Sequence, residues 1–368
     1  MRIRSAQGWP MLEARKAVRN LPTYHPPLGG RDGLRLDFNE NTAGCSPRVL
    51  ARLRKITAEE IACYPERGPV EALVADYFAI ERNELLLTNG VDEAIHLLCN
   101  TFLQPGDEAV IVVPTFAMYE ISAAATGAQV ITVPAEKDFR FPVSELLSKV
   151  RPNTRLIAIA NPNNPTGSVA DEKSLLEIAS RVPQAAILVD EAYFEFYGKT
   201  LLAQWRNLSN LFVARTFSKA YGLAGLRIGV LSGNAKHIAK VSKIASPYNV
   251  NGVALACLPT ALADQDYIRH YVGQVCRGRD ELLKEFSQWG VRHWPSQANF
   301  VLASLGSQKT AFLQSMRARG ILVRDRSRDH GCGGCVRVTL GTAEHTKRLL
   351  QALRETLTEI QSKKVAST

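Results

Sequence analysis

A lysine set between small hydroxyl side chains and glycines is the part of this sequence that most suggests chemistry. Residues 216–227 read TFSKAYGLAGLR, so Thr216 and Ser218 precede Lys219, and Arg227 follows eight residues later. A desolvated and immobilised lysine forms a Schiff base with a carbonyl compound. Hydroxyls and an arginine suit a phosphate group, and glycines let a ligand approach the backbone. The segment suggests pyridoxal 5′-phosphate bound covalently to Lys219. The alternative is a solvated lysine in a surface loop, the usual meaning of so short a match.

Seven short apolar runs predict the sheet that positions this lysine. They lack the alternation of a half-exposed strand, which indicates strands buried on both faces. The runs are residues 84–88, 109–113, 129–133, 156–160, 186–189, 211–214 and 227–230. Helices are expected between them, including 70–78 and 92–102, and this order predicts an α/β domain with a mostly parallel sheet.

Polar residues able to bind a cofactor follow four of these strands. Ligands of open α/β sheets bind outside the carboxyl ends of the strands. The residues at those ends are Gly90, Val91 and Asp92 after 84–88, Asn161 after 156–160, Asp190 and Tyr193 after 186–189, and Thr216, Ser218 and Lys219 after 211–214. Because four loops converge on one edge, the surface-loop interpretation of Lys219 becomes much weaker.

The rest of the chain suggests an N-terminal arm and a second, smaller domain. Residues 1–44, rich in Pro, Gly and Arg, are expected to form an irregular arm, residues 45–245 the large domain and residues 246–368 a small α+β domain. A helical stretch from Ala235 is expected to break at Pro247. The elements expected in the small domain are a helix over 270–285, strands over 298–302 and 335–340, and a closing helix over 344–360.

Composition and charge argue against several classes of protein. At 368 residues, with 46% apolar and 22% charged residues, the chain is typical of a globular protein with one large and one smaller domain. It has no run of about eighteen apolar residues that could cross a membrane and no signal-peptide pattern at its start, so a cytoplasmic location is expected. The net charge of +10 is interspersed with acids and no nucleic-acid-binding motif is present, so we expect no nucleic-acid partner and an attraction for small anionic ligands.

The cysteines predict neither a disulfide framework nor a metal site. There are seven, an odd number scattered through the chain, which argues against a secreted disulfide-linked fold. Only Cys332 and Cys335 form a C-x-x-C pair, and a structural zinc site needs a second pair or nearby histidines. Although His330 is close, we expect a reduced glycine-rich turn and no metal.

Three segments in combination resemble the fold-type-I pyridoxal-phosphate-dependent aminotransferases of class I and II. They are residues 161–167 (NPNNPTG), 190–193 (DEAY) and 218–229 (SKAYGLAGLRIG), and the resemblance extends over most of the chain. It implies a large domain with a mostly parallel central sheet and a smaller α+β C-terminal domain. Within the family, the chain is most similar to the histidinol-phosphate aminotransferase group, on the segments 18–24 (VRNLPTY), 36–41 (LDFNEN), 321–325 (ILVRD) and 335–342 (CVRVTLGT).

The resemblance implies roles around the cofactor ring. Lys219 carries the cofactor and then moves the Cα proton. Asp190 pairs with the pyridine nitrogen, unless it is only a helix N-cap. Tyr193 and Asn161 donate to the phenolic oxygen of the ring. Phe116 stacks on the ring in a position where many relatives have tyrosine, although it could also be a core residue.

The cofactor phosphate has its own expected cradle. The backbone amides at Gly90, Val91 and Asp92 open a helix and form an anion site, provided that the acidic side chains of Asp92 and Glu93 point away. The other members implied by the resemblance are Thr216, Ser218, Arg227 and, from the partner subunit, Tyr64. The chain is therefore expected to be a homodimer with shared active sites.

The residues predicted to bind the substrate include a cation in an unusual position. Arg337 lies in an otherwise apolar strand, where a charge is costly unless an anion pairs with it. The resemblance makes it the carboxylate ligand of glutamate and a phosphate ligand of histidinol phosphate, with Arg324 and Tyr24 as further phosphate ligands. Asn39 and Asn161 are expected to complete the substrate site, with residues 39–41 on the imidazole side, and a solvated Arg324 is the alternative.

The implied reaction converts L-histidinol phosphate and 2-oxoglutarate into imidazole-acetol phosphate and L-glutamate, a step of histidine biosynthesis. An aromatic amino acid aminotransferase and a decarboxylase of a phosphorylated amino acid share most of these motifs and remain alternatives. The arginines at 324–328 favour a phosphorylated substrate. A regulator with an aminotransferase-like domain is disfavoured, since only about forty residues precede the expected catalytic region, too few for a DNA-binding domain.

Overall fold

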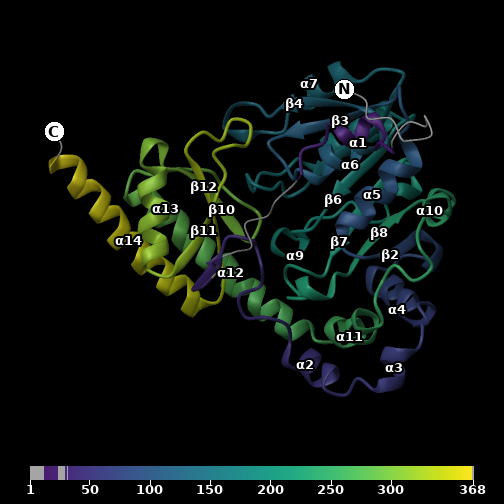
Figure 1. Cartoon of the computed structure of the whole chain (residues 1–368), viewed down its shortest axis with the longest axis horizontal. Helices are drawn as coiled ribbons and strands as arrows, with labels where there is room; N and C mark the ends of the chain where they lie inside the picture. The colour runs from purple at the N-terminus through teal and green to yellow at the C-terminus, as the bar shows by residue number, and fades with distance from the viewer. Residues whose placement is uncertain (1–11, 24–29, 31, 367–368) are drawn as a thin grey trace, which may run out of the picture.

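The computed structural model describes residues 12–23, 30 and 32–366, and the structural statements below refer to these residues. They form two lobes, one around a seven-stranded sheet and one around a five-stranded sheet (Figure 1). Within the same residues, no helix is both long enough and apolar enough to cross a membrane.

The larger sheet is mostly parallel, as predicted. Its strands, in spatial order, are β2 (Leu85–Thr88), β8 (Gly229–Gly233), β7 (Leu211–Thr216), β6 (Ala186–Asp190), β5 (Thr154–Ala160), β3 (Glu108–Val113) and β4 (Gln129–Pro134). Only β8 runs antiparallel to both of its neighbours. The carboxyl ends of β5, β6 and β7 therefore lie side by side, and this is the edge of the sheet at which the sequence predicts the site.

Helices cover both faces of this sheet, which explains the unbroken apolar runs. In β3, Val110 packs in one hydrophobic cluster and Ala109 and Ile111 pack in another. One cluster is completed by α5 (Val91–Phe102), α6 (Met118–Thr126) and α10 (Ala235–Ser242), and the other by α4 (Gly68–Phe78), α8 (Glu172–Arg181) and α11 (Gly252–Ala263). The expectation of two buried faces is wrong for β4, where only Val133 is buried, because β4 is the edge strand.

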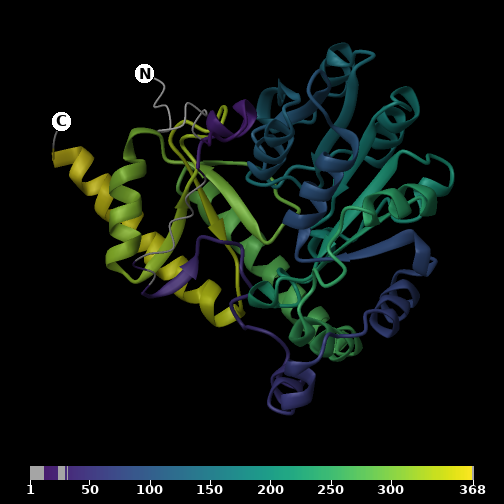
Figure 2. The same cartoon turned by 45° about the vertical axis from the view of Figure 1, so that its right-hand side comes forward.

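The smaller sheet includes a strand from the N-terminal part of the chain. Its order is β1 (Leu34–Leu36), β11 (Ile321–Asp325), β12 (Cys335–Thr339), β10 (Phe300–Ser304) and β9 (Arg292–His293). The helices α12 (Gln265–Gln288), α13 (Lys309–Ala318) and α14 (Ala343–Ala366) pack in the same lobe. Since β1 pairs in parallel with β11, residues expected in an irregular arm lie beside the C-terminal strands in both views (Figures 1 and 2).

Several boundaries differ from the sequence predictions. The strand expected over 227–230 begins only at Gly229, because Arg227 has a left-handed φ of 52°. β11 was not predicted as a strand, and the helix from Ala235 ends at Ser242, before Pro247. The remaining elements are α1 (Lys16–Arg19), α2 (Pro47–Leu53), α3 (Ala58–Ala62), η1 (Arg82–Glu84), η2 (Lys137–Phe139), α7 (Val143–Lys149), α9 (Phe194–Tyr197), η3 (Gln204–Arg206), η4 (Ala224–Leu226) and η5 (Gly306–Gln308).

Candidate active site

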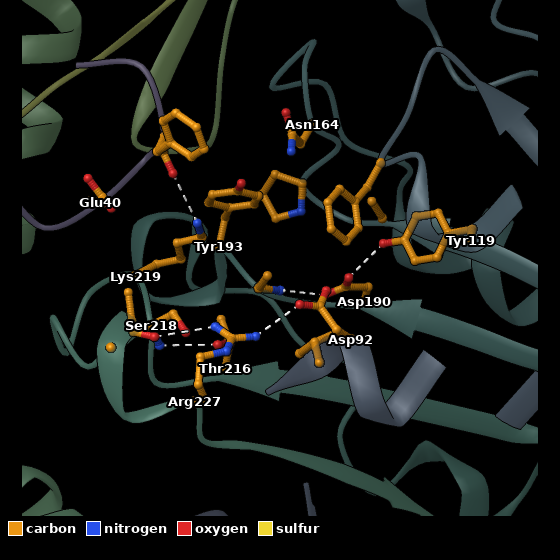
Figure 3. A pocket seen from close by; sticks show the side chains of 18 residues that line it. Glu40, Asp92, Tyr119, Asn164, Asp190, Tyr193, Thr216, Ser218, Lys219 and Arg227 are labelled. Atoms are coloured by element: carbon orange, nitrogen blue, oxygen red, sulfur yellow. Dashed lines mark hydrogen bonds and ion pairs between the residues drawn. The ribbon is translucent and has the colours of Figure 1, made fainter. Parts of the chain in front are cut away.

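A cavity of about 390 Å³ lies at the carboxyl ends of β5, β6 and β7 (Figure 3). Its walls bring together most of the residues predicted to bind the cofactor, namely Val91, Asp92, Phe116, Asp190, Tyr193, Thr216, Ser218, Lys219 and Arg227. They come from segments up to 136 positions apart in the chain (227 minus 91), so the fold, and not the local sequence, assembles the site. We call this cavity the lysine pocket.

Lys219 is held in the pocket just after β7. Its Nζ donates a hydrogen bond to the carbonyl oxygen of Phe38 at 3.3 Å and lies 6.0 Å from the centre of the Tyr193 ring. Desolvation lowers the pKa of Lys219 to about 8, and the nearby charge of Arg337 adds to this effect. A lysine with such a pKa is readily neutral, which is the state in which an amine attacks a carbonyl carbon.

Asp190 ends β6 at the bottom of the pocket. Its Oδ2 accepts a hydrogen bond of 2.6 Å from the hydroxyl of Tyr119, and its Oδ1 accepts one of 3.0 Å from the backbone N–H of Ala192. Burial raises the pKa of Asp190 to about 6, while these two hydrogen bonds oppose the rise. The N-cap of α9 is Tyr193, so the N-cap interpretation of Asp190 is wrong.

Tyr193 and Asn39 form a buried pair beside the lysine. The amide Nδ2 of Asn39 donates to the Tyr193 hydroxyl at 2.9 Å. Asn39 has a φ of 57° and is held by Thr339, whose hydroxyl donates to Asn39 Oδ1 at 2.9 Å. Asn39 does not itself line the pocket and contacts Tyr193, which does, so its predicted role in substrate binding stays a prediction.

The beginning of α5 provides the expected backbone cradle. Gly90, the N-cap of α5, has a left-handed φ of 78°, which favours glycine, and a Cβ there would displace the guanidinium of Arg227, whose Nη2 would lie 2.6 Å away. Thr216 Oγ1 accepts from the backbone N–H of Ser218 at 3.1 Å, which brings both hydroxyls to the same side. A helix N-terminus with hydroxyls and a guanidinium nearby suits a phosphate group.

The side chains of Asp92 and Glu93, the two acidic residues in the first turn of α5, make different contacts. Glu93 points away, as expected, and accepts hydrogen bonds from the backbone N–H of Asn89 and from Asn249. Asp92 does not, since it lines the pocket and forms an ion pair of 2.9 Å with Arg227 (Figure 3). An exposed carboxylate can hold an arginine in place in this way until a more strongly charged anion arrives.

The structure separates the two asparagines of the 161–167 loop. Asn161 is buried, its Oδ1 accepts from the backbone N–H of Ala170 at 2.9 Å, and it does not line the pocket. Asn164 does line it, and its Oδ1 accepts from Nη1 of Arg337. The ligand role expected for Asn161 therefore fits Asn164 instead, because Asn161 is used to close its own loop.

Two arginines of the smaller sheet face each other beside the lysine pocket. Arg324 in β11 and Arg337 in β12 are directly paired across the strands. Arg337 is buried and also donates to the carbonyl oxygen of Asp37 at 2.6 Å. Burial, together with the charge of Arg326, lowers the pKa of Arg337 to about 9. Arg324 stacks on Phe38, with its guanidinium carbon 5.1 Å from the ring centre.

The predicted roles of Tyr24 and Tyr64 stay predictions. Tyr24 lies outside the described residues. Tyr64 is 75% exposed and stacks on Tyr248 with the ring centres 4.0 Å apart. Neither position tests the predicted role, and that of Tyr64 depends on a second subunit.

Several residues of the pocket wall were not named as site residues in the sequence. Those whose side chains can stack or form hydrogen bonds are Phe38, Tyr119 and Asn164, while Glu40 lies in the segment 39–41 expected on the imidazole side. Asn164 shares its motif with Asn161, and Tyr119 follows Phe116 by three residues, its backbone N–H donating to the Phe116 carbonyl oxygen at 3.3 Å in the turn that leads into α6. The rings of Phe116 and Tyr119 indeed pack edge to face, with centres 5.8 Å apart.

Comparisons with known proteins agree with this geometry. Residues 31–353 match the family model of class I and II aminotransferases. The chain is 34% identical to a histidinol-phosphate aminotransferase of Geobacillus sp. (strain WCH70), covering 95% of this chain and 100% of that protein. It is 31% identical to that of Moorella thermoacetica, covering 94% and 93%.

A solved structure extends the likeness to the fold. The histidinol-phosphate aminotransferase of Sinorhizobium meliloti in complex with pyridoxal-5′-phosphate superposes with a TM-score of 0.85 at 25% identity, covering 94% of this chain and 98% of that one. The predicted fold class and cofactor, pyridoxal 5′-phosphate, are thereby confirmed. The chain belongs to the class I and II aminotransferases.

Proposed function

We propose that this chain catalyses transamination between L-histidinol phosphate and 2-oxoglutarate, giving imidazole-acetol phosphate and L-glutamate, in histidine biosynthesis. The observation that carries the proposal is the Arg324–Arg337 pair beside the lysine pocket. Two like charges on paired strands are unfavourable without an anion between or beside them. A phosphate group is such an anion, and both named relatives are histidinol-phosphate aminotransferases.

The residues of the lysine pocket fit the cofactor. When bound, pyridoxal 5′-phosphate stabilises the electron pair left at the substrate Cα once its proton is removed. Lys219 supplies the amine that anchors the cofactor, and Asp190 supplies a buried carboxylate for the ring nitrogen. Thr216, Ser218 and Arg227 supply donors for the cofactor phosphate, together with the backbone at the beginning of α5.

Lys219 is also the group that moves the proton. Its Nζ would take the proton from the substrate Cα and return it to the carbon on the other side of the substrate nitrogen, and the first of these transfers requires a neutral amine. The pKa of about 8 keeps that state accessible near neutral pH. Tyr193, oriented by Asn39, offers a hydroxyl on the same side of the pocket.

Arg337 is positioned to serve both substrates in turn. A guanidinium accepts either a carboxylate or a phosphate in a bidentate arrangement. Asn164 and the Asp37 carbonyl hold two of its nitrogens, which fixes the plane of the group. The phosphorylated donor and the dicarboxylate acceptor can thus share one anchoring site, with Arg324 as an additional phosphate ligand.

We further propose a homodimer of cytoplasmic location in which Tyr64 of one subunit reaches the cofactor phosphate of the other. Several large apolar side chains are exposed between residues 50 and 77, on and between the helices α2, α3 and α4. Such exposure favours a surface that a second subunit covers. The exposed side chains include Leu50, Ile61, Tyr64, Leu73 and Tyr77.

The amino-donor profile of the purified holoenzyme tests the proposal. With 2-oxoglutarate as acceptor, histidinol phosphate is expected to give glutamate and imidazole-acetol phosphate without release of CO₂. Phenylalanine as the better donor supports an aromatic aminotransferase, and CO₂ release from O-phosphothreonine supports a decarboxylase. Either of these results contradicts the proposal.

A further inference from the structure

A second cavity of about 690 Å³ adjoins the lysine pocket on the side of the smaller sheet. Phe116 lines both cavities, and Phe38 of the lysine pocket carries the stacked guanidinium of Arg324. The charged groups that line the second cavity are Arg317, Arg324, Arg326, Arg328, Asp37, Asp325 and Asp329. Its position makes it an extension of the substrate site and not a separate one.

Arg326 occupies an inner position in this cavity. Its backbone N–H donates to the carbonyl oxygen of Cys335 at 3.0 Å, so the pairing of β11 with β12 continues one residue beyond β11. Because side chains two residues apart in an extended strand share a face, Arg326 lies on the side of Arg324. Its side chain is only 14% exposed. Its charge contributes to the lowered pKa of Arg337, so the two cations are within electrostatic reach.

Some donor nitrogens of these cations have no acceptor although acids line the same cavity. Asp325 forms an ion pair with Lys309 at 2.8 Å and accepts from Ser327, so it is engaged elsewhere. Asp329 pairs with Nη2 of Arg326 at 2.5 Å. Within the part of the chain that the structure describes, Arg324 Nη1, Arg326 Nε and Arg337 Nε are buried and have no hydrogen-bond acceptor.

Three buried donors without acceptors on three neighbouring guanidinium groups indicate a missing anion. Leaving such donors unsatisfied is unfavourable, and an incoming oxyanion would remove that penalty. A phosphate monoester carries close to two negative charges and three acceptor oxygens, whereas a carboxylate carries one charge and two oxygens. Phosphate can therefore engage all three arginines, but a carboxylate is already satisfied by Arg337.

We infer that Arg326 is a specificity-determining residue, which binds the phosphate of the amino donor and takes no part in binding the carboxylate acceptor. The inference rests on the proposed function, since it assumes a phosphorylated donor. In this arrangement Asp329 holds Arg326 in place before the donor binds. Phosphate then approaches the free Nε, while the ion pair with Asp329 keeps the other side of the guanidinium oriented.

Arg348 offers a matched control. It lies in α14, carries the same charge, is exposed and lines neither cavity. Arg326→Met and Arg348→Met therefore change the net charge equally, and only the first removes a buried donor. Arg326→Lys keeps the charge but loses the planar group, so it should restore binding only partly.

The experiment measures KM and kcat of each holoenzyme variant for histidinol phosphate and for 2-oxoglutarate. R326M is expected to raise KM for histidinol phosphate by about tenfold or more, which is the usual effect of losing a hydrogen bond to a charged group. KM for 2-oxoglutarate should stay within about twofold in R326M, and KM for both substrates should stay within about twofold in R348M. Unchanged melting temperature and cofactor absorbance in R326M exclude a folding defect.

Inorganic phosphate provides a readout that does not depend on the natural donor. It should inhibit the half-reaction of the wild type with glutamate, and R326M should weaken this inhibition about tenfold while R348M does not. Equal changes for both substrates, or no change with either probe, overturn the inference. If wild type rejects histidinol phosphate but phosphate inhibition still depends on Arg326, the proposed substrate is wrong and the phosphate site stands.

Discussion

The hydroxyl of Tyr119 donates a hydrogen bond of 2.6 Å to the carboxylate of Asp190, at the bottom of the pocket that contains Lys219 (Figure 3). Both residues are buried. A buried carboxylate tends to take up a proton, and a donor hydrogen bond opposes this by stabilising the ionised form. Tyr119 therefore helps to keep Asp190 charged at neutral pH, as pairing with a protonated ring nitrogen requires.

Tyr119→Phe removes this donor while keeping the ring and its packing. The pKa of Asp190, already raised to about 6 by burial, should rise further. Because the ionised form is the active one, activity falls as the pH falls through this pKa, and the acidic limb of the kcat/KM profile should move up by roughly one pH unit. A variant with reduced activity but an unmoved acidic limb would show that Tyr119 acts by packing alone.

The lowered pKa of Lys219 predicts how the apoprotein takes up its cofactor. With a pKa of about 8 the amine is protonated below that value and neutral above it. The rate at which pyridoxal 5′-phosphate forms its visible absorbance band with apoprotein should rise with pH and level off above about 8. Lys219→Ala serves as the control and should form no borohydride-reducible adduct. A rate that is still rising at the ordinary pKa of lysine contradicts the assigned environment.

Asn161→Ala and Asn164→Ala should fail in different ways. Asn161 closes its own loop by accepting from the Ala170 N–H, so its loss should lower the free energy of unfolding by about 1–3 kcal/mol. Asn164 orients Arg337, so its loss should raise KM for both substrates by roughly tenfold at nearly unchanged stability. Denaturant unfolding and steady-state kinetics of the two variants distinguish these outcomes. If instead Asn161→Ala raises KM and Asn164→Ala lowers stability, then Asn161 is the residue that contacts the ligand.

Mixed dimers test the role of Tyr64 across the interface. Lys219→Ala and Tyr64→Ala are each expected to bind the cofactor poorly, by roughly tenfold or more. A dimer with one subunit of each kind has one site that contains both Lys219 and the partner's Tyr64, so mixing should restore normal cofactor affinity and activity at that site. If the mixture shows only the average of the cofactor affinity and activity of the two variants, Tyr64 does not act across subunits.

The sequence was sufficient for the residues at strand ends. Asp190, Thr216, Ser218 and Lys219 all follow buried strands, and the order of helices and strands brings such ends to one edge. Tyr193 also follows one of these strands, Arg227 belongs to the segment of Lys219, and Phe116 was placed by resemblance to the family; all three line the pocket.

The remaining residues depended on packing that the sequence does not encode locally. Asn161 and Asn164 stand in the same motif, and only the fold decides which amide faces the pocket. Tyr119 lies inside a helix, where an aromatic residue usually indicates core packing. β1 is short and pairs with β11, nearly three hundred residues away, so its strand could not be inferred from the composition of the N-terminal segment.

Competition between histidinol phosphate and phenylalanine for the wild-type holoenzyme tests the central claim most directly. The Arg324–Arg337 pair predicts that kcat/KM favours histidinol phosphate by about tenfold or more, and that Arg324→Met brings the ratio down because only the phosphorylated donor loses a contact. A preference for phenylalanine by about tenfold or more, or a ratio that Arg324→Met leaves unchanged, would contradict the proposed substrate.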